Sequence, residues 1–305
     1  MLELRHSLNS CLIRTVRDQS KIRMCRLQLS CGPTCQEEDM ASEIWAHRGS
    51  SKSQPENTMA AFEQAAADKA EGIELDVQRS RDGRLLVYHD ENLKRLTGHD
   101  AYLATLNWAD LQQLNVAANR PEAGVHHIPL LEKVVEFIKG TDLKLNIELK
   151  NSNIFYPGME EEVLALVEKA GILDQVRFSS FNHMSMKKMA AMGFGEISGL
   201  LYSEVLYDPH VYAGGCGVGA IHPMFNNLQV PDLVKNCHEA GLKVNVWTID
   251  EEVFLNSALL LNVDVIMTNL PARAIELRDQ YLKDGGLSAL QSLKNSGLLD
   301  LLTVP

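Results

Sequence analysis

The chain has 305 residues, of which 45% are hydrophobic and 23% charged, values typical of a globular protein with room for one large α/β barrel or two modest domains. The formal net charge of −11 argues against nucleic acid or an anionic membrane as the main partner, because both bind basic surfaces. No stretch approaches the ~18 uninterrupted apolar residues of a membrane helix, so we expect no stable membrane insertion.

Residues 1–40 differ from the rest of the chain. They show no sustained helical or strand period and mix polar residues with the basic residues Arg14, Arg17, Lys21, Arg23 and Arg26. We interpret this stretch as a disordered extension, with a targeting peptide as the less favoured alternative.

The six cysteines give little support to a zinc site. Cys31 and Cys35 form a lone pair, without a second Cys or His pair at zinc-finger spacing. The given sequence does not show the pattern of a secretory signal, which is a charged start followed by an apolar run. The sequence therefore predicts a cytoplasmic protein with reduced thiols.

From Glu43 onward the pattern predicts strands that alternate with helices. Strands are expected at residues 43–47, 73–77, 85–88, 143–149, 176–180, 197–202, 219–222, 243–248 and 264–268. Helices are expected at residues 58–69, 130–138, 160–170, 184–192, 230–240, 251–260 and 272–281. The alternation covers about 240 residues, close to the ~250 typical of a (β/α)8 TIM barrel, which we place at residues 41–283. The alternative is an open doubly wound sheet, but no Gly-x-Gly-x-x-Gly follows a strand.

Two segments break the alternation. Residues 91–127 are polar with one short helical stretch near 106–114, and we interpret them as an insertion at one end of the barrel, after an early strand. The tail, residues 284–305, carries Leu287, Leu290, Leu293 and Leu298 near helical spacing. We expect it to pack on the barrel; a contact within a homo-oligomer is the alternative.

Carboxylates gather on the inward faces of two predicted strands. Alternation places Glu74 and Asp76 on one face of their strand, and Glu148 with Lys150 on one face of another. Barrel strands pack their outer face on helices, so these charges must point inward, where they need neutralising. Three carboxylates at one mouth favour a bound cation, and all-oxygen ligation favours Mg²⁺ or Ca²⁺. The alternative is ion pairing, of Glu148 with Lys150 and of Glu74 with a nearby arginine.

Two histidines end predicted strands beside this cluster. A free histidine titrates near ~6.5, so of His47 and His89 one can act as a general base and the other as a general acid near neutral pH. Arg48 and Lys150 add fixed positive charge suited to phosphate oxygens. A phosphate ester or diester is the substrate that these residues indicate.

Six motifs in order resemble those of the glycerophosphodiester phosphodiesterase family. They are His47-Arg48-Gly49, Pro55-Glu56-Asn57-Thr58, Glu74-Leu75-Asp76, His89-Asp90, Glu148-Leu149-Lys150 and Trp247-Thr248. The resemblance covers about residues 43–281. It implies a barrel related to phosphatidylinositol-specific phospholipase C, with a small insertion. It also implies cation-dependent hydrolysis of glycerophosphodiesters to sn-glycerol 3-phosphate and an alcohol.

The resemblance also implies roles for individual residues. Glu74, Asp76 and Glu148 would bind the metal, and His47 and His89 would be the acid–base pair. Apart from the resemblance, we favour His89 as the acid. Arg48 and Lys150 would hold the phosphate, and Phe181 and Trp247 would line the substrate pocket.

Two other functions remain as alternatives. A lyase or phospholipase that acts on intact lipids would be favoured by long apolar loops at the mouth. The sequence offers only Ile154-Phe155-Tyr156-Pro157, which we interpret as a lid. A non-catalytic ligand-binding barrel would be favoured by loss of a histidine or carboxylate, and none is lost.

Overall fold

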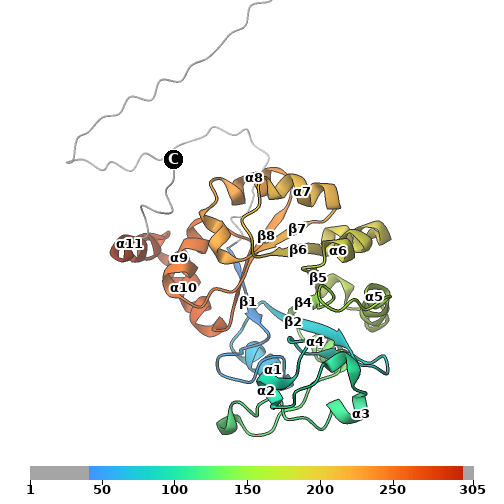
Figure 1. Ribbon diagram of the computed structural model, residues 1–305. Helices are drawn as coiled ribbons and strands as arrows, with labels where there is room; N and C mark the ends of the chain where they lie inside the picture. Colours follow the sequence, from blue (N-terminus) through green and yellow to red (C-terminus); the bar gives the residue numbers. More distant parts are fainter. Residues whose placement is uncertain (1–40, 298–305) are drawn as a thin grey trace, which may run out of the picture. The chain divides into compact units, whose positions relative to one another are not determined.

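The computed structural model describes residues 41–297, in which eight parallel strands close into a barrel (Figure 1). The strands are β1 Glu43–His47, β2 Gly72–Arg79, β3 Leu85–Val87, β4 Lys144–Leu149, β5 Val176–Ser180, β6 Ser198–Tyr202, β7 Ala220–Pro223, β8 Lys243–Val246 and β9 Val265–Thr268. The extension predicted at residues 1–40, with its cysteine pair, and Leu298 of the tail lie outside the described residues.

The strand order confirms the predicted (β/α)8 barrel. Neighbours run β1-β9-β8-β7-β6-β5-β4-β2, and β1 pairs in parallel with β2 to close the ring. The short β3 is the exception, because it lies antiparallel on the far half of β2. β2 is therefore next to β4 inside the barrel, although β3 separates them in sequence.

Helices surround the strands (Figure 1). They are α1 Met59–Ala67, α2 Lys94–Thr97, α3 Trp108–Leu111, α4 Leu131–Lys139, α5 Met159–Ala170, α6 His183–Met189, α7 Pro209–Cys216, α8 Leu233–Glu239, α9 Glu252–Leu260, α10 Pro271–Asp284 and α11 Leu287–Ser296. The apolar stripe of α4, which includes Val134 and Ile138, is buried against the barrel as its periodicity requires. Thr58 caps α1 by accepting a hydrogen bond from the Ala61 backbone N–H.

Residues 91–127 build a small layer beside β3. It contains α2 and α3 and has an apolar cluster of its own, formed with the end of β3 by residues such as Leu86, Leu96 and Leu111. This layer follows β3, which pairs with the carboxyl-terminal end of β2, so it lies at the same end of the barrel as the predicted site residues.

Among the helices that differ from the sequence-based expectation are α7 and α8. α7 was not predicted, because Gly214 and Gly215 within it weaken the helical pattern. α8 begins at Leu233 rather than residue 230, because Pro231 follows a short 3₁₀ turn that ends at Gln229. None of the helices in residues 41–297 is long and apolar enough to cross a membrane.

Candidate active site

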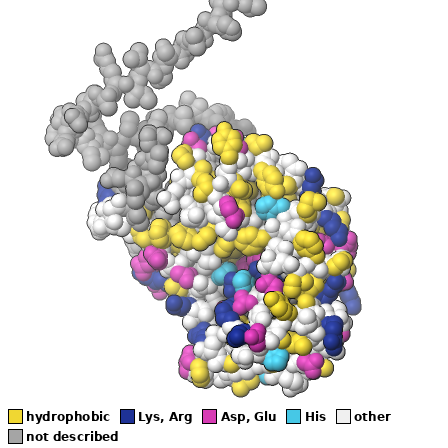
Figure 2. Space-filling model, in the orientation of Figure 1, with side chains coloured by type: hydrophobic (Ala, Val, Ile, Leu, Met, Phe, Trp, Pro, Cys, Tyr) yellow, Lys and Arg dark blue, Asp and Glu magenta, His cyan; other side chains and the backbone are white. Residues whose placement is uncertain are grey.

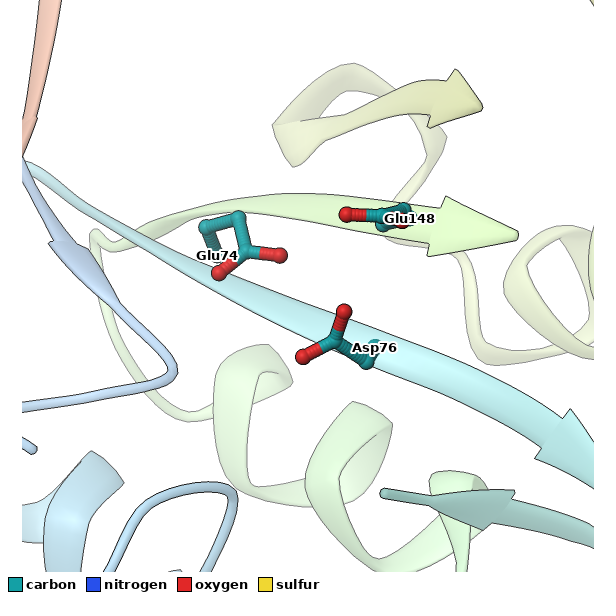
Figure 3. Close-up of side chains that lie close together, drawn as sticks. All are labelled: Glu74, Asp76 and Glu148. Atoms are coloured by element: carbon teal, nitrogen blue, oxygen red, sulfur yellow. The ribbon is translucent and has the colours of Figure 1, made fainter. Parts of the chain in front are cut away.

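Three carboxylates converge inside the barrel at its carboxyl end. The register of β2 and β4 places Asp76 opposite Glu148, and Glu74 lies two residues before Asp76 on the same inward face. Figure 3 shows the three side chains pointing toward one another from the two strands. One oxygen of each lies within 4.8 Å of the other two, and all three residues are buried.

Burial and neighbouring charges shift the pKa values of the three carboxyl groups in different directions. Burial and the charges of Asp76 and Glu148 raise the pKa of Glu74 well above its usual value. Burial also raises the pKa of Glu148, although Lys150 opposes the shift. Burial disfavours the charged form of Asp76 too, but Arg48 and Lys150 hold its pKa below the usual range.

The cluster fits a bound cation. Glu74 Oε1 and Asp76 Oδ1 are buried and accept no hydrogen bond within residues 41–297. Buried carboxylate oxygens of this kind are costly unless a proton or a cation neutralises them. The acidic triad can therefore hold a metal ion.

Ion pairs satisfy only part of the cluster. Lys150 Nζ lies 2.9 Å from Glu148 and 3.8 Å from Asp76, and Arg48 Nε lies 3.3 Å from Asp76. Glu74 has no Lys or Arg side chain at ion-pair distance in the described part of the chain; it accepts the backbone N–H of Arg48 instead. The ion-pair alternative thus accounts for Glu148 and not for Glu74.

The turn after β1 directs this backbone contact. Arg48 and Gly49 both have positive φ, 57° and 78°, and Gly49 lies so close to α1 that a Cβ would come within 2.6 Å of the Ala61 backbone. A glycine is therefore required at the second of these positions.

The hydrogen bonds around His47 suit a neutral imidazole ring whose Nε2 can accept a proton. Its Nδ1 lies 2.8 Å from Asn269 Oδ1. Asn269 must present this oxygen, because its Nδ2 donates to Asp250 and Ser51 Oγ donates to the same Oδ1. Nδ1 of His47 is thus the donor, and Nε2 carries the lone pair. Burial, with the nearby charge of Arg48, lowers the pKa of His47 to about 4.

His89 has a carboxylate for its partner. Nδ1 lies 2.6 Å from Asp90 Oδ1, and Arg95 binds the same carboxylate. Despite partial burial, hydrogen bonds from His89 and Arg95 hold the pKa of Asp90 below its usual range. Arg95 also donates two hydrogen bonds to Glu56, which accepts a third from Arg48. One chain of charged contacts therefore runs from His89 to Arg48.

A cavity of about 130 Å³ collects most of the predicted residues. Its lining includes His47, Arg48, Glu74, His89, Glu148, Phe181 and Trp247. The rings of Phe181 and Trp247 meet edge to face, with centroids 5.5 Å apart. Asp76 and Lys150 are not part of the lining and reach it through their contacts with Arg48 and Glu148.

Sequence reasoning missed several residues that hold this set. Asn57 donates to Asp76 at 2.8 Å, and Asn269 and Arg95 fix the histidine environments. Asn269 follows directly after the last predicted strand, a position at the mouth that could have indicated it. Arg95 lies in the insertion, and nothing in its sequence surroundings indicates its contacts.

Comparison with known proteins finds relatives both in sequence and in structure. Residues 47–273 match the model described as the glycerophosphoryl diester phosphodiesterase family. A Caldanaerobacter subterraneus protein named glycerophosphodiester phosphodiesterase is 36% identical over 240 residues, covering 78% of this chain and 98% of the relative. A Bacillus altitudinis protein of the same name is 36% identical over 242 residues, covering 78% and 99%. An Oleispira antarctica phosphodiesterase solved with the product sn-glycerol-3-phosphate has a TM-score of 0.67 and 27% identity, covering 78% and 97%.

Proposed function

Because the chain belongs to the glycerophosphoryl diester phosphodiesterase family and is thus a phosphoric diester hydrolase, we propose that it hydrolyses glycerophosphodiesters to sn-glycerol 3-phosphate and an alcohol. The observation that carries the proposal is the pair of oppositely held histidines in one cavity beside the carboxylate triad. The substrate is a small molecule, as the product bound to the Oleispira antarctica relative is.

The triad takes a divalent cation in this proposal. Glu74, Asp76 and Glu148 offer only oxygen, which suits Mg²⁺ or Ca²⁺. When bound, such an ion supplies Lewis-acid stabilisation of negative charge on phosphoryl oxygens. Lys150 and Arg48 are the cations of the protein next to this position, and they balance part of the carboxylate charge.

His47 is the general base. Because Asn269 accepts the Nδ1 proton, the Nε2 lone pair of a neutral ring is available to the cavity. It removes the proton from the attacking hydroxyl, which is water or the 2-hydroxyl of the glycerol moiety. Attack by the 2-hydroxyl gives a cyclic phosphate that water then opens.

His89 is the general acid. Its Nδ1 is bound by the Asp90 carboxylate, which complements the charge of a doubly protonated ring and leaves Nε2 for the cavity. From there it donates a proton to the departing alcohol oxygen. Phe181 and Trp247 form the apolar wall against which the substrate lies.

Release of sn-glycerol 3-phosphate from glycerophosphocholine tests the proposal. We expect turnover by the purified protein, loss of turnover after chelation, and recovery with Mg²⁺ or Ca²⁺. Glu148→Gln removes one negative ligand and should weaken metal binding in a direct titration while the circular dichroism spectrum is unchanged. Glu122→Gln, at an exposed acidic residue in the insertion, is the matched control. Full turnover in a metal-stripped sample would contradict the proposed role of the triad.

A further inference from the structure

A second cavity lies inside the barrel at its amino end. Its volume is about 250 Å³, and its lining includes Trp45, Gly199, His222, Asn245 and Val265. On four strands the residue two positions after a lining residue faces the catalytic cavity instead: His47 on β1, Leu201 on β6, Trp247 directly after β8 and Met267 on β9. Because these strands are parallel, the two cavities lie at opposite ends of one barrel interior (Figure 1). We call the second one the amino-end cavity.

An apolar partition separates the two cavities. One hydrophobic cluster contains residues that line each of them: Trp45 and Val265 on one side, Met267 and Trp247 on the other. The triad carboxylates and the two catalytic histidines are not in the lining of the amino-end cavity. This cavity is therefore a separate site from the one that cleaves the phosphodiester.

A histidine–asparagine pair in the amino-end cavity has unmet hydrogen-bonding capacity. Asn245 Nδ2 lies 2.9 Å from His222 Nε2, and the two residues are 4% and 1% exposed. His222 Nδ1 and Asn245 Oδ1 have no hydrogen-bond partner within residues 41–297. Burial lowers the pKa of His222 to about 3, so the ring is neutral and carries a single N–H.

The free groups of this pair are complementary whichever way the amide is turned. If Nδ2 of Asn245 donates to His222, the groups left over are the ring Nδ1–H and the amide oxygen. If the amide oxygen accepts from Nε2–H instead, they are an amide N–H and a bare Nδ1. One donor and one acceptor stay without a partner in both cases. A hydroxyl group can satisfy both, since it donates and accepts.

The barrel interior gives up packing to hold this pair. Gly199 lies on β6 beside β7, and a Cβ there would come within 2.4 Å of His222 Nε2. The imidazole therefore takes the space that a side chain on β6 would fill. Buried polar groups normally have a partner, so a pair left open toward a cavity points to a bound molecule.

The charges that line the amino-end cavity restrict what can occupy it. Three of these side chains are basic and three acidic, so their formal charges cancel: Lys144, Arg177, Lys243, Glu43, Glu196 and Asp264. On the face shown in Figure 2, acidic and basic side chains are likewise intermixed. A molecule with a net charge would meet as many like charges as opposite ones. Hydroxyl groups gain from both kinds, because carboxylates accept hydrogen bonds and ammonium and guanidinium groups donate them.

We propose that the amino-end cavity binds a small uncharged polyol, one hydroxyl group of which bridges His222 and Asn245. This hydroxyl accepts a hydrogen bond from one side chain of the pair and donates one to the other, and the remaining hydroxyls meet the charged side chains of the lining. The cavity is smaller than the ~300–1,000 Å³ of pockets for drug-sized ligands, which suits a molecule of a few carbon atoms. Binding requires neither the metal ion nor the phosphodiester.

Titration with three four-carbon compounds tests the amino-end cavity. The readout is the NMR signal of isotope-labelled histidine rings in the full chain with Mg²⁺ present, and His222→Gln identifies the His222 signal by its loss. meso-Erythritol should shift this signal saturably, and butane-1,4-diol should do so more weakly. The isomer of the diol, 1,2-dimethoxyethane, has oxygens that only accept hydrogen bonds and should give no saturable shift.

Two asparagine variants locate the binding. Asn245→Leu removes the amide that shares the hydroxyl and should weaken erythritol binding by about tenfold or more, the effect of one lost hydrogen bond. Asn236→Leu is the matched control, because this residue lies on α8 and outside the lining of the cavity. It should leave erythritol binding unchanged.

Each other outcome decides against the polyol. A shift of the His222 signal that is linear in concentration and equal for the three compounds would show that only water fills the cavity. A saturable shift confined to the His47 and His89 signals would place the polyol in the catalytic cavity. Tighter binding of inorganic phosphate than of erythritol at His222 would assign the site to an anion. Where circular dichroism shows that Asn245→Leu is unfolded, the comparison of the two isomers on the wild-type protein decides.

Discussion

The two histidines of the site differ in the group that binds ring nitrogen Nδ1. His47 donates Nδ1–H to an amide oxygen, whereas His89 is bound by a carboxylate. Neutral and charged partners of this kind favour neutral and charged rings, respectively. Two residues of the same type can therefore take opposite parts in one proton-transfer cycle.

Leaving-group chemistry should reveal these two parts. His47→Ala and His89→Ala should each lower kcat on glycerophosphocholine by about 10²–10⁴, the usual contribution of general acid–base catalysis. On a diester that releases p-nitrophenol, which needs little protonation, His89→Ala should recover most of its rate and His47→Ala should not. The measurement is kcat for both variants on both substrates, and equal recovery of the two would contradict the assignment.

Arg95 should act as a positioning residue through Asp90 and Glu56. Arg95 does not line the cavity or bind the triad, but its guanidinium donates hydrogen bonds to the carboxylates of Asp90 and Glu56. Arg95→Ala should lower kcat on glycerophosphocholine by roughly tenfold, at the low end of the effect of such supporting contacts. Arg95→Lys keeps the charge but not the forked geometry and should recover only part of the rate. A loss that disappears on the p-nitrophenyl diester would place the effect on His89 rather than on the general fold.

At the scale of elements, the contact of β1 with β2 depends on a missing side chain. Gly72 opens β2 opposite Trp45, and a Cβ there would lie 2.6 Å from the indole ring. Gly72→Ala should therefore lower the free energy of unfolding by about 1–3 kcal/mol, as overpacking does. Gly214→Ala is the matched control, since a Cβ on this α7 glycine meets nothing within 4 Å. It should raise the free energy of unfolding by about 0.4–1 kcal/mol. Urea unfolding followed by circular dichroism measures both.

Strand alternation was sufficient to predict which side chains point inward. Glu74, Asp76 and Glu148 follow from the two-residue period of a strand, which is a property of the backbone itself. The adjacency of β2 and β4 could not be predicted, because nine strands were expected and no local signal marks β3 as the one outside the ring.

Contacts between segments far apart in the chain also limited what could be predicted from the sequence. Asn269 reaches His47 across 222 positions and Arg95 reaches Glu56 across 39, so neither pairing has a spacing that a sequence pattern can express. Within elements, periodicity predicted α4 and α5 to within a residue or two, whereas the glycines of α7 removed the period on which such a prediction depends.

For the whole molecule, a histidine outside the active site should link stability to pH. His222 is 1% exposed on β7, and burial lowers its pKa to about 3. The unfolded chain binds a proton at this histidine below about pH 6.5, whereas the folded protein does not until about pH 3. Its contribution is therefore complete above pH 6.5 and is lost as the pH falls from 6.5 toward 3, by about 1.4 kcal/mol per pH unit.

Replacing this histidine should remove that part of the pH dependence. His222→Gln has no group that titrates there, so the free energy of unfolding should fall less steeply between pH 6.5 and 5 than in the wild-type protein. Denaturant unfolding at several pH values gives both slopes, and parallel slopes would show that His222 does not carry the dependence.

The closure of the barrel by β1 and β9 also determines when the active site can form during synthesis of the chain. β1 is the first strand of the barrel and pairs with the last, β9, and the asparagine that orients His47 lies just after β9. A nascent chain that has emerged only as far as residue 260 already contains the three carboxylates and both histidines. It still has an open edge on β1, and His47 lacks the partner that selects its tautomer. Catalytic competence therefore requires that β9 and Asn269 have left the ribosome, long after Glu148 has done so.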